Sequence, residues 1–247
     1  MRDAGDTPTV RLQVCVNGAR AADDHPALPV RPRAVADDLL RCLRVGADAI
    51  HVHPRGEDGT ESLDAADVAR TLLAIRRVAP DVEISVSTGA WIEPDPVRRL
   101  GQIRRWEHLP DVASVNLSEV GAVETAEVLL DRGIGVEAGL WSVADVDRLA
   151  VSGLAGRCRR LLVEAVGGES PEDAAALVTT VLEALDGVGA TGDRLVHGAG
   201  RSTWAVLSLA GRLGLATRIG LEDTRRLPDG RRADSNAALV AAACRLL

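Results

Sequence analysis

The sequence of 247 residues contains no lysine, no tyrosine and no phenylalanine, so all 29 of its basic residues are arginine. The absence of lysine excludes Schiff-base aldolases, pyridoxal enzymes and P-loop nucleotide sites, because each of these requires a lysine amine. The side chains left for acid–base chemistry are those of histidine, aspartate, glutamate and cysteine. Arginine is the only side chain with a fixed positive charge.

Long apolar runs are also missing. No stretch approaches the roughly 20 residues that span a bilayer, and the first residues, MRDAGDTPTV, lack the apolar centre of a signal peptide. The four cysteines have no CxxC or zinc-finger spacing, which favours reduced thiols. The net charge of −7 argues against nucleic-acid binding. We therefore expect a cytoplasmic protein that binds small molecules rather than a membrane or a nucleic acid.

Short β-branched runs alternate with amphipathic segments along the chain. Strands are predicted at 10–16, 48–53, 83–88, 113–118, 133–139, 160–166, 194–200 and 217–223. Helices are predicted at 34–45, 64–79, 95–106, 122–132, 142–152, 171–186, 201–213 and 234–247, with caps at Ser170 and at Ser62 or Asp64. Eight such alternations predict a (β/α)8 TIM barrel, as one domain over residues 1–247. A doubly wound open sheet is the competing topology, but its expected glycine-rich turn is reduced to a single glycine in VCVNGAR.

Polar residues gather at the carboxyl ends of the predicted strands, where a barrel carries its catalytic groups. Apolar residues would stand there if these ends only packed. Instead, three of the five histidines and four carboxylates meet on one rim. The rim residues are Asn17, Arg20, His51, His53, Ser87, Thr88, Ser114, Asn116, Ser118, Glu137, Glu164, His197, Arg218, Glu222 and Asp223.

The pair His51 and His53 points to a metal ion. Residues i and i+2 of a strand face the same side, ~6.5–7 Å apart, and two imidazoles so placed can hold one zinc ion. Two histidines that only satisfy a polar interior would give the same pattern. Glu222 is the first choice for a third ligand, because the last strand closes the barrel near the second. His197 and Glu137 are the alternatives.

Three further rim features have open roles. Asp223 is expected to turn outward as its strand ends, beside the metal but not bound to it, which suits a general base. An acidic pair that only caps the next helix is the alternative. Arg218 either pairs with Asp223 or binds a substrate carboxylate. The glycine-rich turn HGAGRST, residues 197–203, either presents backbone N–H groups to an anion or serves simply as a loop.

Several motifs together resemble those of the β-keto acid cleavage enzymes. They are NGAR, LPVRPRAVADDLLRCLRVGADAIHVHPRGEDGT, VSTGAW, ASVNLS, GIGVEAGLW, GAGRSTW, ATRIGLEDT and DSNAALV, and the resemblance runs over residues 10–246. Members of this family are zinc-dependent TIM barrels that react a β-keto acid with acetyl-CoA. The products are acetoacetate and a new CoA thioester.

The resemblance implies a role for each residue that matches a family motif. The implied zinc ligands are His51, His53 and Glu222. The implied catalytic base is Asp223, supported by Arg218. Acetyl-CoA is the implied co-substrate, and a homo-oligomer, either dimer or tetramer, is the expected assembly.

The same resemblance assigns residues to the keto acid. Ser87 and Ser114 are implied to contact the keto acid, and Ser87 is also expected to be a catalytic residue. Thr88 and Asn116 are expected to bind substrate beside them. At one position, members of the family can have an acidic residue that contacts the amino group of an amino-bearing substrate, and this chain has Arg20 at that position. An arginine repels a cationic amine, so 3-keto-5-aminohexanoate is not the expected substrate, and a dicarboxylic or neutral β-keto acid fits better, although Arg20 can instead point into solvent.

The chain is also shorter than typical members, around the predicted strands 5 to 7 and at the carboxyl end. Some of those regions contribute to CoA access and to subunit contacts, so two other functions stay open. One is a zinc-dependent lyase or hydrolase that acts without CoA. The other is a non-catalytic binding barrel, against which the complete set of three ligands argues.

Overall fold

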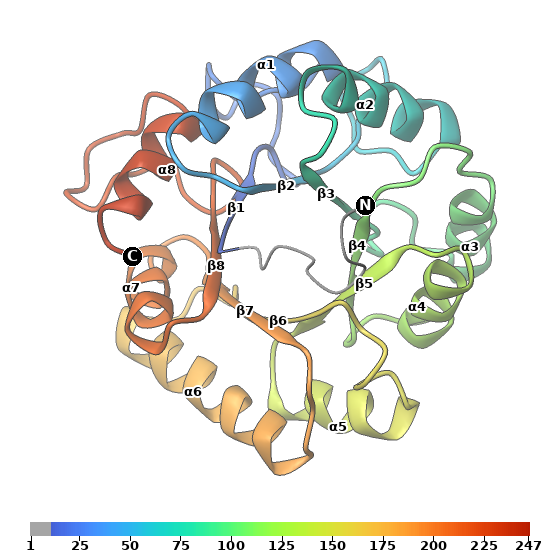
Figure 1. Cartoon of the computed structure of the whole chain (residues 1–247), viewed down its shortest axis with the longest axis vertical. Coiled ribbons are helices and arrows are strands. Elements are labelled where there is room, and N and C mark those ends of the chain that lie inside the picture. The colour runs from blue at the N-terminus through green and yellow to red at the C-terminus, as the bar shows by residue number, and fades with distance from the viewer. Residues whose placement is uncertain (1–10) are drawn as a thin grey trace, which may run out of the picture.

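The computed structural model describes residues 11–247, so the amino-terminal stretch considered above, residues 1–10, lies outside the described part. Eight parallel strands each pair with the next along the chain, and the last pairs with the first to close a barrel (Figure 1). They are β1 Leu12–Cys15, β2 Ala49–Val52, β3 Glu83–Ser87, β4 Val112–Asn116, β5 Gly135–Leu140, β6 Arg160–Ala165, β7 Asp193–Gly198 and β8 Ala216–Ile219. The predicted TIM barrel is confirmed, and the open sheet is wrong.

A helix follows each strand and packs outside the barrel (Figure 1). The helices are α1 Pro32–Leu43, α2 Ala65–Val78, α3 Pro96–Arg104, α4 Ala122–Asp131, α5 Val143–Ser152, α6 Pro171–Gly187, α7 Thr203–Leu213 and α8 Asn236–Cys244. Two predicted caps are confirmed: Asp64 accepts a hydrogen bond from the N–H of Ala66, and Ser170 from that of Asp173. Within residues 11–247, no helix has the length and apolar character needed to cross a membrane.

The strands alternate between an apolar outer face and a polar inner face. Outward-facing residues such as Val14, Ile50 and Val136 are fully buried in the hydrophobic core beneath the helices. On the inner face, Gln13 of β1 donates a hydrogen bond to Glu137 of β5 (3.1 Å). Because β1 and β5 are not neighbours in the sheet, this contact crosses the barrel interior.

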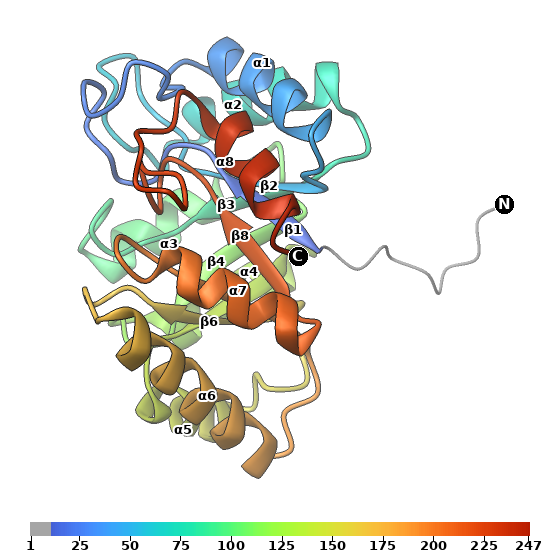
Figure 2. The same cartoon turned by 90° about the vertical axis from the view of Figure 1, so that its left-hand side faces the viewer.

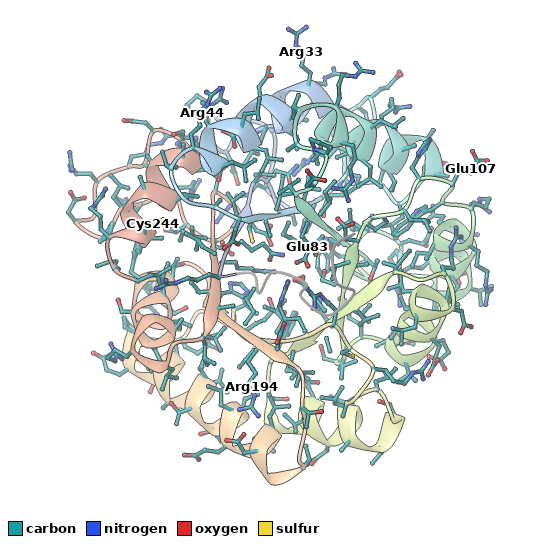
Figure 3. All side chains as sticks on the ribbon, in the orientation of Figure 1. Arg33, Arg44, Glu83, Glu107, Arg194 and Cys244 are labelled. Carbon is teal, nitrogen blue, oxygen red and sulfur yellow. The ribbon has the colours of Figure 1, made fainter. Side chains whose placement is uncertain are left out.

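A layer of ion pairs lies inside the barrel, toward the amino ends of the strands. The guanidinium of Arg160, itself 1% exposed, donates to Glu137 (2.7 Å) and to Glu83 (2.5 Å). Glu83 projects from β3 into the barrel, whereas Arg33 and Arg44 project from its outer surface (Figure 3). Buried charges are tolerated where they are paired, as they are here. This layer therefore closes the barrel interior on the side opposite the rim.

Strand β8 ends earlier than the sequence suggests, at Ile219 rather than residue 223. A Cβ on Gly220 would lie 1.8 Å from the carbonyl oxygen of Cys15, so only glycine lets the chain pass β1 so closely. The chain then turns, and the N–H groups of Asp223 and Thr224 both donate to the carbonyl of Gly220. The acidic residues at 222 and 223 therefore lie on a turn, not on a strand.

Candidate metal centre and active site

Two histidines and one glutamate meet at the carboxyl end of the barrel. His51 lies on β2, His53 follows that strand directly, and Glu222 comes from the turn after β8. The two Nε2 atoms are 3.2 Å apart, and Nε2 of His53 is 3.7 Å from Oε1 of Glu222. All three residues can offer a ligand atom within 4.8 Å of one another. The residues expected as metal ligands are thus brought together.

The partners of the two Nδ1 atoms fix which ring nitrogens carry protons. Nδ1 of His53 lies 2.5 Å from Oε1 of Glu61, an acceptor, so the proton of this ring is on Nδ1. Nδ1 of His51 lies 3.0 Å from the hydroxyl of Ser85, whose proton is used on Glu137 (2.9 Å). The hydroxyl can therefore only accept, and His51 also carries its proton on Nδ1.

When both rings are neutral, the two Nε2 atoms face each other as lone pairs, which is a repulsive arrangement unless a cation lies between them. Burial lowers the pKa of His51 well below its usual value, which keeps this ring neutral and able to act as a ligand. The buried Oε2 of Glu222 has no hydrogen-bond partner within residues 11–247. These residues fit a metal ion, and two imidazoles with one carboxylate are a donor set that zinc accepts.

The two alternative third ligands lie elsewhere. Glu137 belongs to the ion-pair layer with Arg160. His197 lies between two carboxylates, with Nε2 2.6 Å from Glu164 and Nδ1 3.3 Å from Asp223. Strands β6 and β7 place Glu164 and His197 in register, which explains the short contact.

Asp223 does not turn outward as expected, because the early end of β8 folds it back against the barrel. Its side chain is 1% exposed, and its Oδ1 lies 3.3 Å from Nδ1 of His197 and 4.0 Å from Nε of Arg218. Arg218 also donates to Glu164 (3.2 Å) and to Glu222 (3.3 Å). The arginine thus links the ligand set to a second, buried pair of carboxylates.

Charge fixes the protonation states in this network. Burial opposes ionisation of Glu164, but Arg218 and His197 outweigh it and lower its pKa to about 2. Burial and Arg218 act to lower the pKa of His197, but Asp223 and Glu164 outweigh them and raise it. Glu164 therefore stays an anion, and it holds His197 with one ring nitrogen directed at Asp223.

A cavity of about 470 Å³ opens above the metal ligands, and we call it the rim cavity. Its lining residues are Ala19, Arg20, Asp24, His51, His53, Ser87, Trp91, Ser114, Asn116, Trp141, Leu162, Glu164, Val166, Arg218 and Glu222. The serines and the asparagine expected to bind substrate thus line it. Thr88 is not among them, and its hydroxyl donates to the carbonyl of Ser114 (2.6 Å).

Arg20 lies on the wall of the rim cavity and does not simply extend into solvent. Its guanidinium donates to the carbonyls of Leu221 (2.9 Å) and Glu222 (2.9 Å), and its side chain is 25% exposed. Asp24 lies 3.9 Å away. Arg20 therefore fastens the loop after β1 to the turn that carries Glu222.

Sequence reasoning missed Glu61 and Trp91. A short hairpin, bridged between Arg55 and Glu61, folds the chain back so that Glu61 reaches His53. The Asp58–Gly59 pair is a turn signal that could have predicted this hairpin. Trp91 stacks on His53 (centroids 6.1 Å apart) and donates from Nε1 to Glu61 (3.1 Å). No local pattern indicates that contact.

Comparison with known proteins gives the family. The sequence matches the family described as beta-keto acid cleavage enzyme over residues 9–247. The chain belongs to the β-keto acid cleavage enzymes.

Two curated relatives match this chain over short segments. A 3-keto-5-aminohexanoate cleavage enzyme of Fusobacterium nucleatum is 32% identical over 90 residues, which are 36% of this chain and 33% of the relative. A 3-oxoadipate:acetyl-CoA acetyltransferase of Cupriavidus necator is 35% identical over 66 residues, 27% of this chain and 23% of the relative. The matched segments thus span a third or less of either relative.

Solved structures support the barrel fold. A binary complex of ObcA with oxaloacetate superposes with a TM-score of 0.67 at 16% identity, over 87% of this chain and 62% of the ObcA chain. A type I 3-dehydroquinate dehydratase from Clostridium difficile gives a TM-score of 0.60 at 10% identity, over 87% of this chain and 84% of that one. At such identities the likeness shows the fold alone.

Proposed function

We propose that this β-keto acid cleavage enzyme is a zinc-dependent acyltransferase that uses acetyl-CoA. A β-keto acid R–CO–CH2–COO⁻ and acetyl-CoA would give R–CO–S-CoA and acetoacetate. The observation that carries the proposal is the pair of imidazole Nε2 atoms 3.2 Å apart, completed by Glu222, next to a buried carboxylate outside that set, Asp223. Cleavage of a β-keto acid needs both a cation for its oxygens and a base for its central carbon.

His51, His53 and Glu222 would hold the zinc ion, which supplies Lewis-acid polarisation of the keto oxygen and the carboxylate when bound. Asp223 takes a proton from the carbon between the two carbonyl groups. Arg218 and His197 hold that carboxylate in position, as their distances of 4.0 and 3.3 Å suggest.

The remaining steps conserve atoms and charge. The carbon nucleophile attacks the acetyl carbonyl, and the CoA thiolate leaves. The thiolate then adds to the original keto carbon, and the carbon–carbon bond next to it breaks. The departing acetoacetate carbon takes back the proton from Asp223. Ser87 and Ser114, which line the rim cavity, would donate hydrogen bonds to the oxygens of the keto acid.

For the acyl group we propose a dicarboxylic or neutral β-keto acid rather than 3-keto-5-aminohexanoate. The guanidinium of Arg20 on the cavity wall disfavours an ammonium group beside it and favours an anion there, whereas Arg218 is already paired with Glu164 and Glu222. The Cupriavidus relative is named for 3-oxoadipate, a β-keto acid with two carboxylates, which supports the same choice.

A panel of β-keto acids, with one amine-bearing and one dicarboxylic member, tests this function. Acetoacetate should form only when acetyl-CoA is present, together with the new thioester. Equal keto-acid consumption without CoA would favour the CoA-independent lyase. Absence of any conversion, with no metal in protein prepared without chelator, would favour the binding barrel.

A further inference from the structure

A second cavity, of about 740 Å³, adjoins the rim cavity on the side of β7 and β8. It is lined by the loop between β7 and α7 and by the loop between β8 and α8, and Arg20 and Asp24 belong to both cavities. The loops after β1 and β8, blue and red in Figure 2, project from the same side of the barrel. Asp223 also lines this second cavity. The proposed base thus lies on the wall of the second cavity, next to Glu222, which lines the rim cavity.

Five arginines line the second cavity, which we call the arginine basin. They are Arg20, Arg201, Arg225, Arg226 and Arg232. In a chain of net charge −7, five guanidiniums in one cavity are a marked local excess of positive charge. Among residues 11–247, the only carboxylates in the lining are those of Asp24 and Asp223.

Little of this charge is neutralised by the protein. Asp24 lies 3.9 Å from both Arg20 and Arg225, so two guanidiniums share one carboxylate. Asp223 is already held by Arg218 and His197. Within residues 11–247 no ion pair joins Arg201, Arg226 or Arg232 to a carboxylate.

Two of these arginines are also held opposite each other. Arg226 and Arg232 form an antiparallel bridge in the loop after β8, and Arg226 is further fixed by a hydrogen bond from its guanidinium to the carbonyl of Gly230 (2.8 Å). Like charges directly opposite each other on paired strands are unfavourable. A bound anion would turn this repulsion into a two-sided contact.

An aromatic face completes the basin. Trp204, near the start of α7, is partly exposed and lines the cavity, while its Nε1 donates to the carbonyl of Arg226 (2.9 Å). The indole is thus held in place and can stack on a planar heterocycle. Arginine forks suit phosphate oxygens, and loops after strands 7 and 8 of a TIM barrel frequently bind phosphate.

We infer that the arginine basin binds the phosphate-bearing nucleotide of the CoA thioester, with Trp204 against its adenine. The choice of this ligand rests on the proposed function. A nucleotide in the basin would direct its thioester arm past Arg20 and Asp24 toward the rim cavity, because these two residues line both cavities. The basin thus supplies binding of the co-substrate away from the reacting carbons.

Calorimetry on the purified protein with 3′-phospho-ADP, which lacks a thioester, tests binding without turnover. Arg226→Gln combined with Arg232→Gln should weaken binding at least about tenfold, since each charged hydrogen bond to phosphate contributes on that scale. Arg201→Gln, on the loop between β7 and α7, leaves the Arg226–Arg232 bridge intact and should also weaken binding. Arg33→Gln, 94% exposed on α1, is the matched control and should bind as the unmodified protein does (Figure 3).

Steady-state kinetics with two thioesters separates this inference from the proposed function. The basin variants should raise the KM for acetyl-CoA about tenfold or more and leave kcat/KM for S-acetyl-pantetheine unchanged. Unchanged nucleotide binding and an unchanged KM would overturn the inference, although thioester-dependent acetoacetate formation would still support the function. Inorganic phosphate that competes as strongly as 3′-phospho-ADP would overturn the assignment to a nucleotide. Nucleotide binding without acetoacetate formation would support the basin as a nucleotide site and contradict the proposed function.

Discussion

Replacement of Asp223 by asparagine gives the sharpest test of the catalytic assignment. The substitution keeps the size of a side chain that is 1% exposed, so the amide can take the place of the carboxylate, whose Oδ1 lies 3.3 Å from Nδ1 of His197. It removes the group that would take the substrate proton. General-base steps contribute ~10²–10⁴-fold, so kcat should fall by that factor, or about 3–5 kcal/mol of transition-state stabilisation.

The metal content should not change, because His51, His53 and Glu222 are untouched. Acetoacetate formation at saturating substrates gives kcat, and plasma emission spectrometry of the same preparation gives zinc per chain. Asp186→Asn is a matched control: Asp186 is 67% exposed on α6 and pairs with Arg194 (2.6 Å), so its kcat should be that of the unmodified protein. Near-normal kcat in Asp223→Asn would refute the base assignment, and loss of zinc would show that Asp223 belongs to the ligand set.

Four further outcomes are expected. His53→Ala should lose both zinc and activity, by metal analysis and acetoacetate assay. Glu61→Gln should keep the fold but weaken zinc affinity ~10–100-fold, measured by competition with a chelator, because a neutral amide orients the ligand ring and raises its basicity less than a carboxylate does. Arg160→Met should lower the free energy of unfolding by about 3–5 kcal/mol in denaturant titration, since it leaves the buried Glu137 without a cation and Glu83 with Arg159 alone. The pKa of Glu164 is lowered to about 2 in the folded protein, so its ionisation contributes stability that is present above its usual pKa and lost as pH falls through about 2. The difference in free energy of unfolding between the unmodified protein and Glu164→Gln should therefore shrink over that pH range.

Each of these outcomes has a clear opposite. Full zinc occupancy in His53→Ala would remove this histidine from the ligand set. An unchanged chelator midpoint in Glu61→Gln would mean that Trp91 packing alone orients the ring. If Arg160→Met has the same free energy of unfolding as the unmodified protein, the carboxylates of the ion-pair layer are hydrated or protonated in the variant. A Glu164→Gln difference independent of pH would place the effect in packing rather than charge.

The barrel was predictable because its signal is local and repeated. A β-branched run of about five residues alternating with a 3.6-residue apolar period reports burial on each element, without any knowledge of distant contacts. The His51–His53 pair was predictable for the same reason, since residues two apart on one strand share a face whatever the rest of the chain does. Glu222 followed from closure of the barrel, which brings the last strand to the first.

Contacts between residues that are far apart in the sequence were not predictable. The early end of β8 depends on the approach of Gly220 to the backbone of Cys15, over 200 positions away in the chain. That approach is what folds Asp223 inward against His197. Likewise, Glu164 and His197 could be placed on the rim, but their contact depends on the register of β6 with β7, which no single strand encodes.

The distribution of tryptophan gives the molecule built-in optical reporters. With no tyrosine, its near-ultraviolet absorbance and emission come from four indoles. Trp106 is buried in the core, Trp91 and Trp141 line the rim cavity, and Trp204 lines the arginine basin. Single-tryptophan variants can therefore report metal binding at His53, keto acid in the rim cavity and nucleotide in the basin as separate emission changes, with no dye attached.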